Sequence, residues 1–169
     1  MILTMLFFVF IVGLSIGGLL AANRHYPPLF VYVFFVLYFL VSAYIGMIIG
    51  MLFPSFLIGF FITEFLVCTA TFLFLIAVTL KYHPSLGFFY WQEKIVFILL
   101  GSIFFLMGFQ WGIFEFRSFF TFFSCLLFGL ALFIGLFIQI QMKQKFWRYP
   151  LAVFLPCIWL FLITLIKLF

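Results

Sequence analysis

Residues 29–53 read LFVYVFFVLYFLVSAYIGMIIGMLF and contain no charged side chain. An α-helix needs about 20 mostly apolar residues to cross the hydrocarbon core of a bilayer, and this stretch exceeds that length. Its apolar residues are continuous, whereas the strands of a membrane barrel alternate apolar and polar residues over about ten positions. The stretch therefore predicts a transmembrane α-helix, whose backbone polar groups are all paired within the segment.

More stretches of the same kind lie on both sides of it. Breaks at charged residues and prolines predict six spans, at residues 2–22, 29–53, 56–80, 95–114, 118–140 and 151–168. The first has no basic residue ahead of it and is longer than the apolar region of a signal peptide, so we expect a retained span, with a cleaved signal peptide as the alternative. The interruption at residues 115–117 is short enough to fit either a loop or a kink within one long helix, so five spans are the alternative to six.

The composition of the whole chain agrees with this interpretation. Of its 169 residues, 70% are apolar and 7% are charged, far from the average of soluble domains. A soluble fold of this length has too little interior to bury so many apolar side chains. We therefore expect an all-α fold, a polytopic transmembrane helical bundle in which residues 1–169 form a single integral-membrane domain with no soluble domain.

Few residues are available for chemistry. The chain has no Asp, and its only acidic residues are Glu64, Glu93 and Glu115. This excludes most reactions that need paired carboxylates and most Mg²⁺ or Ca²⁺ sites. Sequence motifs for intramembrane proteases are also absent. An enzyme is therefore not the expected class, although the sequence alone leaves it open.

The basic residues predict an orientation rather than a binding surface. Eight Lys and Arg are scattered singly between apolar runs, which does not fit the clustered surface of a nucleic-acid-binding protein. Six of them lie in the first, third and fifth loops (23–28, 81–94 and 141–150), or directly beside these loops, and two on the other side. Because cytoplasmic loops carry the excess of basic residues, we expect those three loops in the cytoplasm or the matrix and both termini on the outer side. The membrane would be a bacterial cell membrane or an organellar inner membrane.

Small residues at four-residue spacing predict where helices pack. Lipid tails are as apolar as Leu, so helices associate in membranes through close contacts that small residues permit. Such residues are Gly13 and Gly17 in the first span, Ser42, Gly46 and Gly50 in the second, and Ala131 and Gly135 in the fifth. These faces could join helices of this chain or bind another membrane subunit.

Glu64 is the most informative polar residue, because it lies well inside the third predicted span. An ionised carboxylate is costly there unless it is paired, hydrated or protonated, and such residues often mark ion pathways or ligand sites. Thr63 precedes it, and Cys68 and Thr71 follow on the same helical face. Two hypotheses stay open: a site that handles a proton, a cation or a ligand headgroup, and a hydrogen bond that fixes helix packing. A proton path normally needs several titratable groups, and the sequence shows no second deep acid or Lys.

The remaining polar groups lie in predicted loops. Lys143, Lys145 and Arg148 either anchor the fifth loop on the inner side or bind anionic lipid headgroups. His25 and His83 each lie near a proline in a short loop, so we interpret them as solvated turn residues. We expect no bound metal and no cofactor.

Three functions are compatible with this pattern. The first is a non-enzymatic small subunit or partner of a larger membrane assembly, for transport or energy coupling. The second is a stand-alone small transporter or ligand-binding membrane protein with a site near Glu64. The third is an enzyme that modifies lipids. The expected partners are the lipid bilayer and, for the first function, other membrane subunits.

Overall fold

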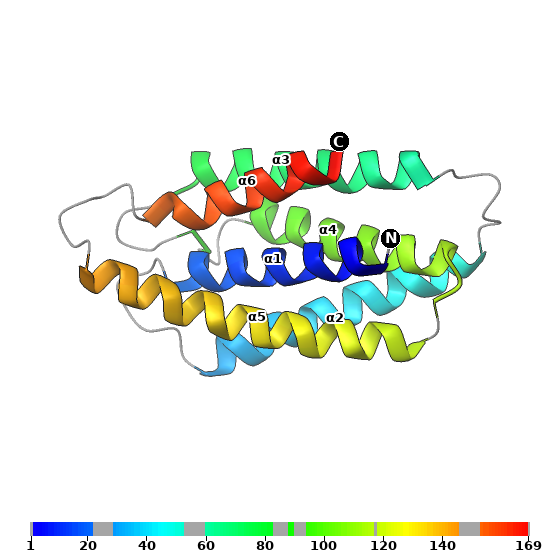
Figure 1. The fold of residues 1–169 in the computed structure, drawn as a ribbon, viewed down its shortest axis with the longest axis horizontal. Coiled ribbons are helices and arrows are strands. Elements are labelled where there is room, and N and C mark those ends of the chain that lie inside the picture. The colour runs from blue at the N-terminus through cyan, green and yellow to red at the C-terminus, as the bar shows by residue number, and fades with distance from the viewer. Residues whose placement is uncertain are drawn as a thin grey trace.

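The structure is a computed structural model, and it describes residues 2–21, 29–52, 60–82, 88–89, 94–116, 118–145 and 153–168. Within these ranges the chain forms six α-helices and no strand, which confirms the expected all-α bundle (Figure 1). The helices are α1 (Ile2–Ala21), α2 (Leu29–Leu52), α3 (Phe60–Leu80), α4 (Lys94–Ile113), α5 (Ser118–Lys145) and α6 (Leu155–Leu168).

Five of these helices are long and apolar enough to cross a membrane. The sixth, α6, has 14 residues, so at 1.5 Å per residue its length is about 21 Å, less than the ~30 Å of a hydrocarbon core. It begins later than the predicted span at 151–168. The reason is Pro156, which a helix tolerates in its first turn but not in its interior.

Helix α5 differs from its predicted span in the opposite direction, because it continues beyond residue 140 to Lys145. The polar residues that follow the apolar run, such as Gln141 and Lys143, are good helix formers. The end of the apolar run therefore does not mark the end of the helix. Part of the predicted loop 141–150 is helical for this reason.

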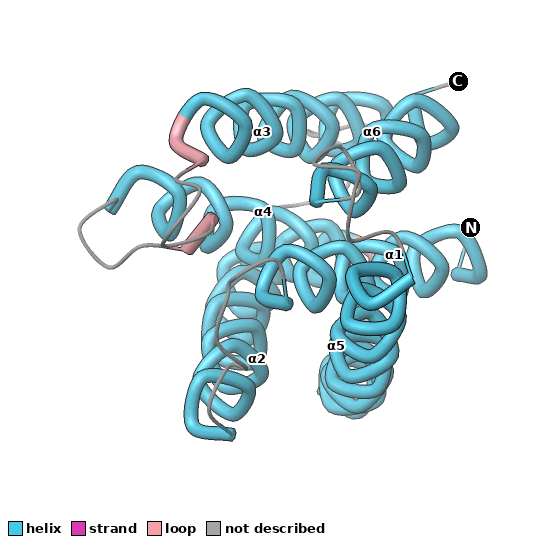
Figure 2. Tube along the Cα trace, turned by 90° about the vertical axis from the view of Figure 1, so that its left-hand side faces the viewer, coloured by secondary structure: helices cyan, strands magenta, loops and turns pink. Residues whose placement is uncertain are grey.

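The contacts divide the helices into two groups, which lie side by side in Figure 2. In one group, α4 packs between α3 and α2, and in the other, α1 packs between α6 and α5. Contacts of α3 with α6 and of α2 with α5 join the groups. Helices α1 and α5 run in the same direction, as do α2 and α4, because residue numbers rise together along both contacts. Helices α2 and α5 run in opposite directions, since Tyr32 contacts Gly129 while the later Val36 contacts the earlier Cys125.

The break between α4 and α5 is a true turn. The amide of Phe116 donates to the carbonyl of Trp111 at 3.1 Å, and the amide of Glu115 donates to that of Gly112 at 3.0 Å. These two bonds form a Schellman motif, whose C′ residue adopts a left-handed conformation. Glu115 has a φ of 56°, although this position is usually glycine. The alternative of one long helix across residues 115–117 is therefore wrong, and α4 and α5 are separate helices among the six that the described residues form.

The small-residue faces of α1 and α5 meet each other inside the chain. A Cβ atom added at Gly17 would collide with the carbonyl oxygen of Leu132, and one added at Gly135 with that of Leu14. Ala131 is fully buried, and its Cβ lies at the same contact, next to Gly13. The backbones of α1 and α5 are thus in direct contact, with no room for a side chain at Gly17 or Gly135.

The small residues of α2 make a matching contact with α4. Cβ atoms added at Gly46 and Gly50 would collide with carbonyl oxygens of α4. Ser42 is only partly buried, and its neighbour Ala43 makes the contact with Gly108 instead.

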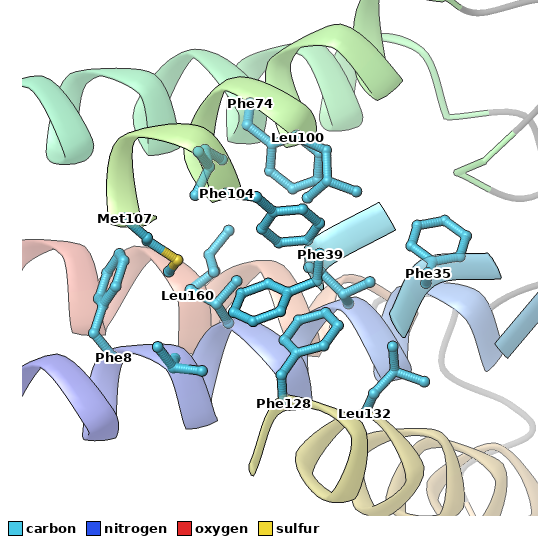
Figure 3. Packing of buried hydrophobic residues seen from close by; sticks show 14 of the residues in the cluster. Phe8, Phe35, Phe39, Phe74, Leu100, Phe104, Met107, Phe128, Leu132 and Leu160 are labelled. Atoms are coloured by element: carbon cyan, nitrogen blue, oxygen red, sulfur yellow. The ribbon is translucent and has the colours of Figure 1, made fainter. Parts of the chain in front are cut away.

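Aromatic side chains fill the centre of the bundle (Figure 3). The rings of Phe39 on α2 and Phe128 on α5 are stacked with their centroids 4.3 Å apart. Phe104 on α4 packs edge-on against both, at 5.0 and 5.3 Å. Edge-on and stacked ring pairs add about 0.5–1.5 kcal/mol beyond the burial of their area. This cluster fixes α2, α4 and α5 relative to one another.

Large apolar side chains also cover the outside of the bundle. On α5, for example, Phe119, Leu126 and Phe133 are 79%, 70% and 60% exposed. Such a surface would be a liability in water, but it fits the hydrocarbon interior of a bilayer. Together with the five long apolar helices, it identifies a multi-pass integral membrane protein.

Candidate functional site

Lys167 contacts two other helices through its ammonium group. Helix α6 runs antiparallel to α1, and its last turn places the Lys167 ammonium over the ring of Phe8, 4.3 Å from the centroid. The same Nζ donates a hydrogen bond to Oε1 of Gln110 on α4 at 3.2 Å. Cation–π attraction of this kind contributes about 0.5–2 kcal/mol, more when the cation is desolvated. The ammonium is therefore held by two helices besides its own.

Gln110 is almost completely buried, with 1% of its surface exposed. Its Oε1 accepts the bond from Lys167, but its Nε2 has no hydrogen-bond partner among the described residues. A buried donor without a partner costs about 1–3 kcal/mol. Buried polar groups of native proteins are nearly always paired, so an unpaired one has to be explained. Two other described side chains share this property, Ser15 and Ser124.

Glu64 lies in the second turn of α3 and is partly buried. Its carboxylate is close enough to Lys167 for electrostatic attraction. The two side chains do not form a direct ion pair within 4 Å. The Glu64 carboxylate therefore has a positive charge nearby without a direct ion pair to it among the described residues.

The other predicted residues of α3 have separate environments. Cys68 is buried, and its thiol donates to the carbonyl of Thr164 on α6 at 3.7 Å. Thr71 is fully buried, and its hydroxyl donates to the carbonyl of Val67 one turn earlier at 2.7 Å. Thr63 is also buried, with 2% of its surface exposed. Of the four predicted residues, Glu64 and Cys68 are within electrostatic range of Lys167, and the Thr71 hydroxyl is paired within its own helix.

We call Phe8, Glu64, Cys68, Gln110 and Lys167 the Lys167 site. It lies where α1, α3, α4 and α6 meet, at the end of the bundle where α3 begins and α4 and α6 end. The sequence does not predict this cluster. Lys167 lies near the end of an apolar run, where a basic residue is interpreted as setting the orientation in the membrane, and Gln110 is interpreted as a residue of the membrane interface. The structure brings Lys167 near Glu64 from the last turn of α6, a proximity that the sequence did not indicate. The one available signal was a Gln close to the end of the fourth predicted span.

The site has both hydrogen-bond donors and a titratable acceptor. The Lys167 ammonium has three N–H donors, of which Gln110 takes one, and the Gln110 amide provides a free N–H₂ donor. Donors of this kind bind oxyanions, and a charged donor makes the bonds stronger and shorter. The Glu64 carboxylate can take up a proton. The arrangement can therefore hold an anionic oxygen group and a proton at neighbouring positions.

Two of the predicted headgroup residues are described by the structure. Lys143 donates to the carbonyl of Ala21 at 2.8 Å, so it caps the C-terminal end of α1. Lys145 is exposed at the end of α5, and Arg148 lies outside the described residues. Lys145 is thus the described lysine that is exposed and remains a candidate for binding headgroups, whereas Lys143 has a structural partner.

The predicted solvated histidines cannot be placed either, because His25 and His83 both lie outside the described residues. In the described part of the chain, no three His, Cys, Asp or Glu residues come together in a way that could hold a metal ion. All three cysteines are buried and free. The Lys167 site is therefore the cluster in the described helices that offers the most polar chemistry.

Comparisons of the chain with models of protein families, with curated proteins and with solved structures found no match. The functional argument consequently rests on the residues of this chain.

Proposed function

We propose that this protein is a small membrane transporter that binds an anionic oxygen group, such as a carboxylate or a phosphate, at the Lys167 site. The observation that carries the proposal is the buried amide of Gln110, whose Nε2 has no partner although a lysine ammonium occupies its Oε1. An anion between these two groups would satisfy the free donor. It would also neutralise the cation in a region of low dielectric constant.

Glu64 has the role of the proton carrier in this proposal. Intramembrane acidic residues commonly serve in proton relays. When Glu64 is protonated, it no longer repels an anion held by Lys167, so binding of the anion and binding of the proton favour each other. Transport of the anion together with a proton follows from this coupling, and a difference in pH would drive it.

The packing of the helices bears on the alternative of a subunit in a larger assembly. Except for Ser42, the small residues that could have bound a partner subunit are occupied by contacts between α1 and α5 and between α2 and α4. The remaining surface is bulky and apolar, which suits lipid. A subunit role and a lipid-modifying enzyme stay hypotheses, but no feature of the described helices favours them over a transporter.

The proposed setting follows from the distribution of charge. We place the protein in a bacterial cell membrane or an organellar inner membrane, with both termini outside. Loops 23–28, 81–94 and 141–150 would face the cytoplasm or the matrix. In this orientation the Lys167 site lies toward the outer face.

The test is an uptake assay in vesicles of phosphatidylethanolamine and phosphatidylglycerol that contain the purified protein. Labelled phosphate and labelled lactate are the two probes, each with and without an imposed pH difference. We expect uptake of at least one probe above that of protein-free vesicles, and faster uptake when the outside is acidic. Lys167→Met and Gln110→Leu should each remove this uptake, whereas Lys94→Met, at the exposed start of α4, should leave it unchanged.

Glu64→Gln separates binding from coupling. The variant keeps the size of the side chain and cannot exchange a proton. We expect it to retain exchange of labelled for unlabelled anion at equal pH but to lose the acceleration by a pH difference. No uptake of either probe by the wild type would refute the proposal, as would wild-type rates in both Lys167→Met and Gln110→Leu. Stoichiometric copurification of another membrane protein in mild detergent would favour the subunit role instead.

A further inference from the structure

The pattern of helix contacts is the same in both halves of the chain. To see this, each helix is exchanged with the helix three places along the chain: α1 with α4, α2 with α5, and α3 with α6. This exchange converts the α1–α5 contact into the α4–α2 contact. It also converts the α1–α6 contact into the α4–α3 contact. The α2–α5 and α3–α6 contacts are each converted into themselves. These are all the substantial helix contacts of the described residues, so the arrangement is unchanged by the exchange.

The relation holds for individual residues. Gly13 packs on the carbonyl of Phe128, and Gly17 on that of Leu132. If 95 is added to the numbers in α1 and 85 is subtracted from those in α5, these pairs become Gly108 with Ala43 and Gly112 with Met47. Both of these contacts exist in the structure, again between a glycine and a carbonyl oxygen.

The reciprocal contacts obey the same two offsets. The carbonyl of Leu14 faces Gly135. The offsets convert this pair into the carbonyl of Phe109 facing Gly50, which is also observed. Three contacts between α1 and α5 thus have counterparts between α4 and α2 without any adjustment of the register.

The burial pattern provides separate support. Every buried residue of α4 from Leu100 to Ile113 corresponds to a buried residue of α1 at the number 95 lower. Likewise, each buried residue of α2 from Phe39 to Gly50 corresponds to a buried residue of α5 at the number 85 higher. Glycine contacts alone could arise from a common packing motif, and the shared burial pattern extends the correspondence along two pairs of helices.

The two halves have opposite directions. Helix α1 is parallel to α5, α5 is antiparallel to α2, and α2 is parallel to α4, so α1 and α4 are antiparallel. Three helices are an odd number, so the second half enters the membrane from the side where the first half leaves it. Repeats of this kind are related by a pseudo-two-fold axis in the membrane plane. In many transporters they form the substrate site at their interface and alternate between two access states.

The same offset relates two of the three buried polar side chains that lack a partner. Adding 95 to Ser15 of α1 gives Gln110 of α4, and both residues are buried with an unpaired polar atom. Ser15 lies seven residues beyond Phe8 along α1, about 10 Å farther from Lys167 toward the opposite end of the bundle. The unpaired groups therefore lie on either side of the middle of the bundle.

We propose that residues 2–80 and 94–168 are inverted-topology repeats, and that Ser15 is the counterpart of Gln110 in a second half-site open to the opposite membrane face. The two halves would adopt each other's packing arrangement in turn, and this change would expose the anion first beside Gln110 and then beside Ser15. The repeat relation stands on the contacts alone, whereas the passage of an anion along it rests on the proposed function. Ser15 can donate a hydrogen bond to the same anionic oxygen group that Gln110 would bind.

The test measures from which side each position is reached. The three native cysteines, Cys68, Cys125 and Cys157, are replaced with alanine, and Ser15→Cys or Gln110→Cys is introduced. The variants are labelled with a membrane-impermeant thiol reagent in sealed vesicles of either orientation. We expect Gln110→Cys to react from one face and Ser15→Cys from the opposite face. The matched control pair is Val12→Cys and Met107→Cys, which the same offset relates and which are buried in an apolar environment, so we expect neither to react.

The outcomes separate the two proposals. Labelling from the same face, or no labelling of Ser15→Cys while Gln110→Cys reacts, overturns the two-sided arrangement. If the cysteine-free background does not fold, Ser15→Cys and Gln110→Cys are introduced one at a time into the wild type, whose three described cysteines are buried, and the labelling of the wild type is subtracted. Labelling of both variants from the same face in that background would also overturn the two-sided arrangement. The labelling assay needs no transported substrate. If the two cysteines are labelled from opposite faces but no anion is taken up, the proposed function is rejected and the repeat is retained.

Discussion

The close contact of two parallel helix pairs gives a direct prediction for Gly17 and Gly112. A Cβ atom built at Gly17 would lie 2.9 Å from the carbonyl carbon of Leu132 and 3.0 Å from the amide nitrogen of Leu136, besides its collision with the Leu132 oxygen. At Gly112 the added atom would lie 2.8 Å from Cα of Gly50 and collide with the oxygen of Met47. These are backbone atoms, so no side chain can rotate to make room.

Gly17→Ala and Gly112→Ala therefore force the helices apart. Overpacking of this kind costs about 1–3 kcal/mol, which partly offsets the gain of about 0.5–1 kcal/mol that alanine has over glycine within a helix. We expect each variant to lower the midpoint of thermal unfolding, by about 2–4 °C per kcal/mol of net destabilisation for a chain of this length. The two variants should behave alike, because their surroundings are equivalent.

Gly129→Ala is the matched control. A Cβ atom there would lie 3.4 Å from the hydroxyl of Tyr32 and 3.7 Å from a methyl group of Val36, which are ordinary contacts. This variant should be as stable as the wild type or slightly more stable. The measurement is helix content against temperature for the purified protein in one detergent. If Gly17→Ala and Gly112→Ala unfold at the wild-type temperature, the backbone contacts that relate the two halves do not exist as described.

Three further variants test single features of the fold by the same measurement. Glu115→Gly should raise stability by about 0.5–1 kcal/mol, because glycine adopts the φ of 56° without the steric cost that a side chain brings; a loss of stability would show that the Glu115 side chain has a role beyond the turn. Tyr32→Phe removes the hydroxyl that donates to the carbonyl of Gly129 at 2.6 Å and should cost about 0.5–1.5 kcal/mol; an unchanged midpoint would contradict this bond between α2 and α5. Lys143→Met removes the donor to the carbonyl of Ala21 and should cost about 0.3–1 kcal/mol, less at high salt; a cost that does not depend on salt would argue against a charged cap.

The sequence predicted the positions of the helices closely, but it was less accurate at their ends. Spans follow from hydropathy, which depends on the transfer of each side chain into lipid and is almost independent of the fold. Helix ends depend on backbone geometry as well, so α5 extends beyond its apolar run and α6 starts late beside Pro156. The turn at Glu115 illustrates the same limit, because a left-handed residue other than glycine leaves no mark in the sequence.

The candidate site was only half visible in the sequence. Glu64 stood out because an acid within an apolar run is costly. Lys167 and Gln110 did not, because their meaning depends on the antiparallel approach of α6 to α1 and on the end of α4 that lies beside it. Residues more than fifty positions apart contact each other only when the helices are arranged in space.

The amino-acid sequence by itself determined that this protein belongs in a lipid bilayer and that it is helical. It also determined the small-residue faces at which helices can approach. Each of these properties depends on the chemistry of neighbouring residues along one helix. Which face meets which helix was decided only by the tertiary structure. Gly13 and Gly17 of α1 have the same four-residue spacing as Gly108 and Gly112 of α4, yet nothing along the chain says that one helix packs on α5 and the other on α2. Partner choice is a property of all six helices packing together, and the inverted repeat and the Lys167 site both arise from it.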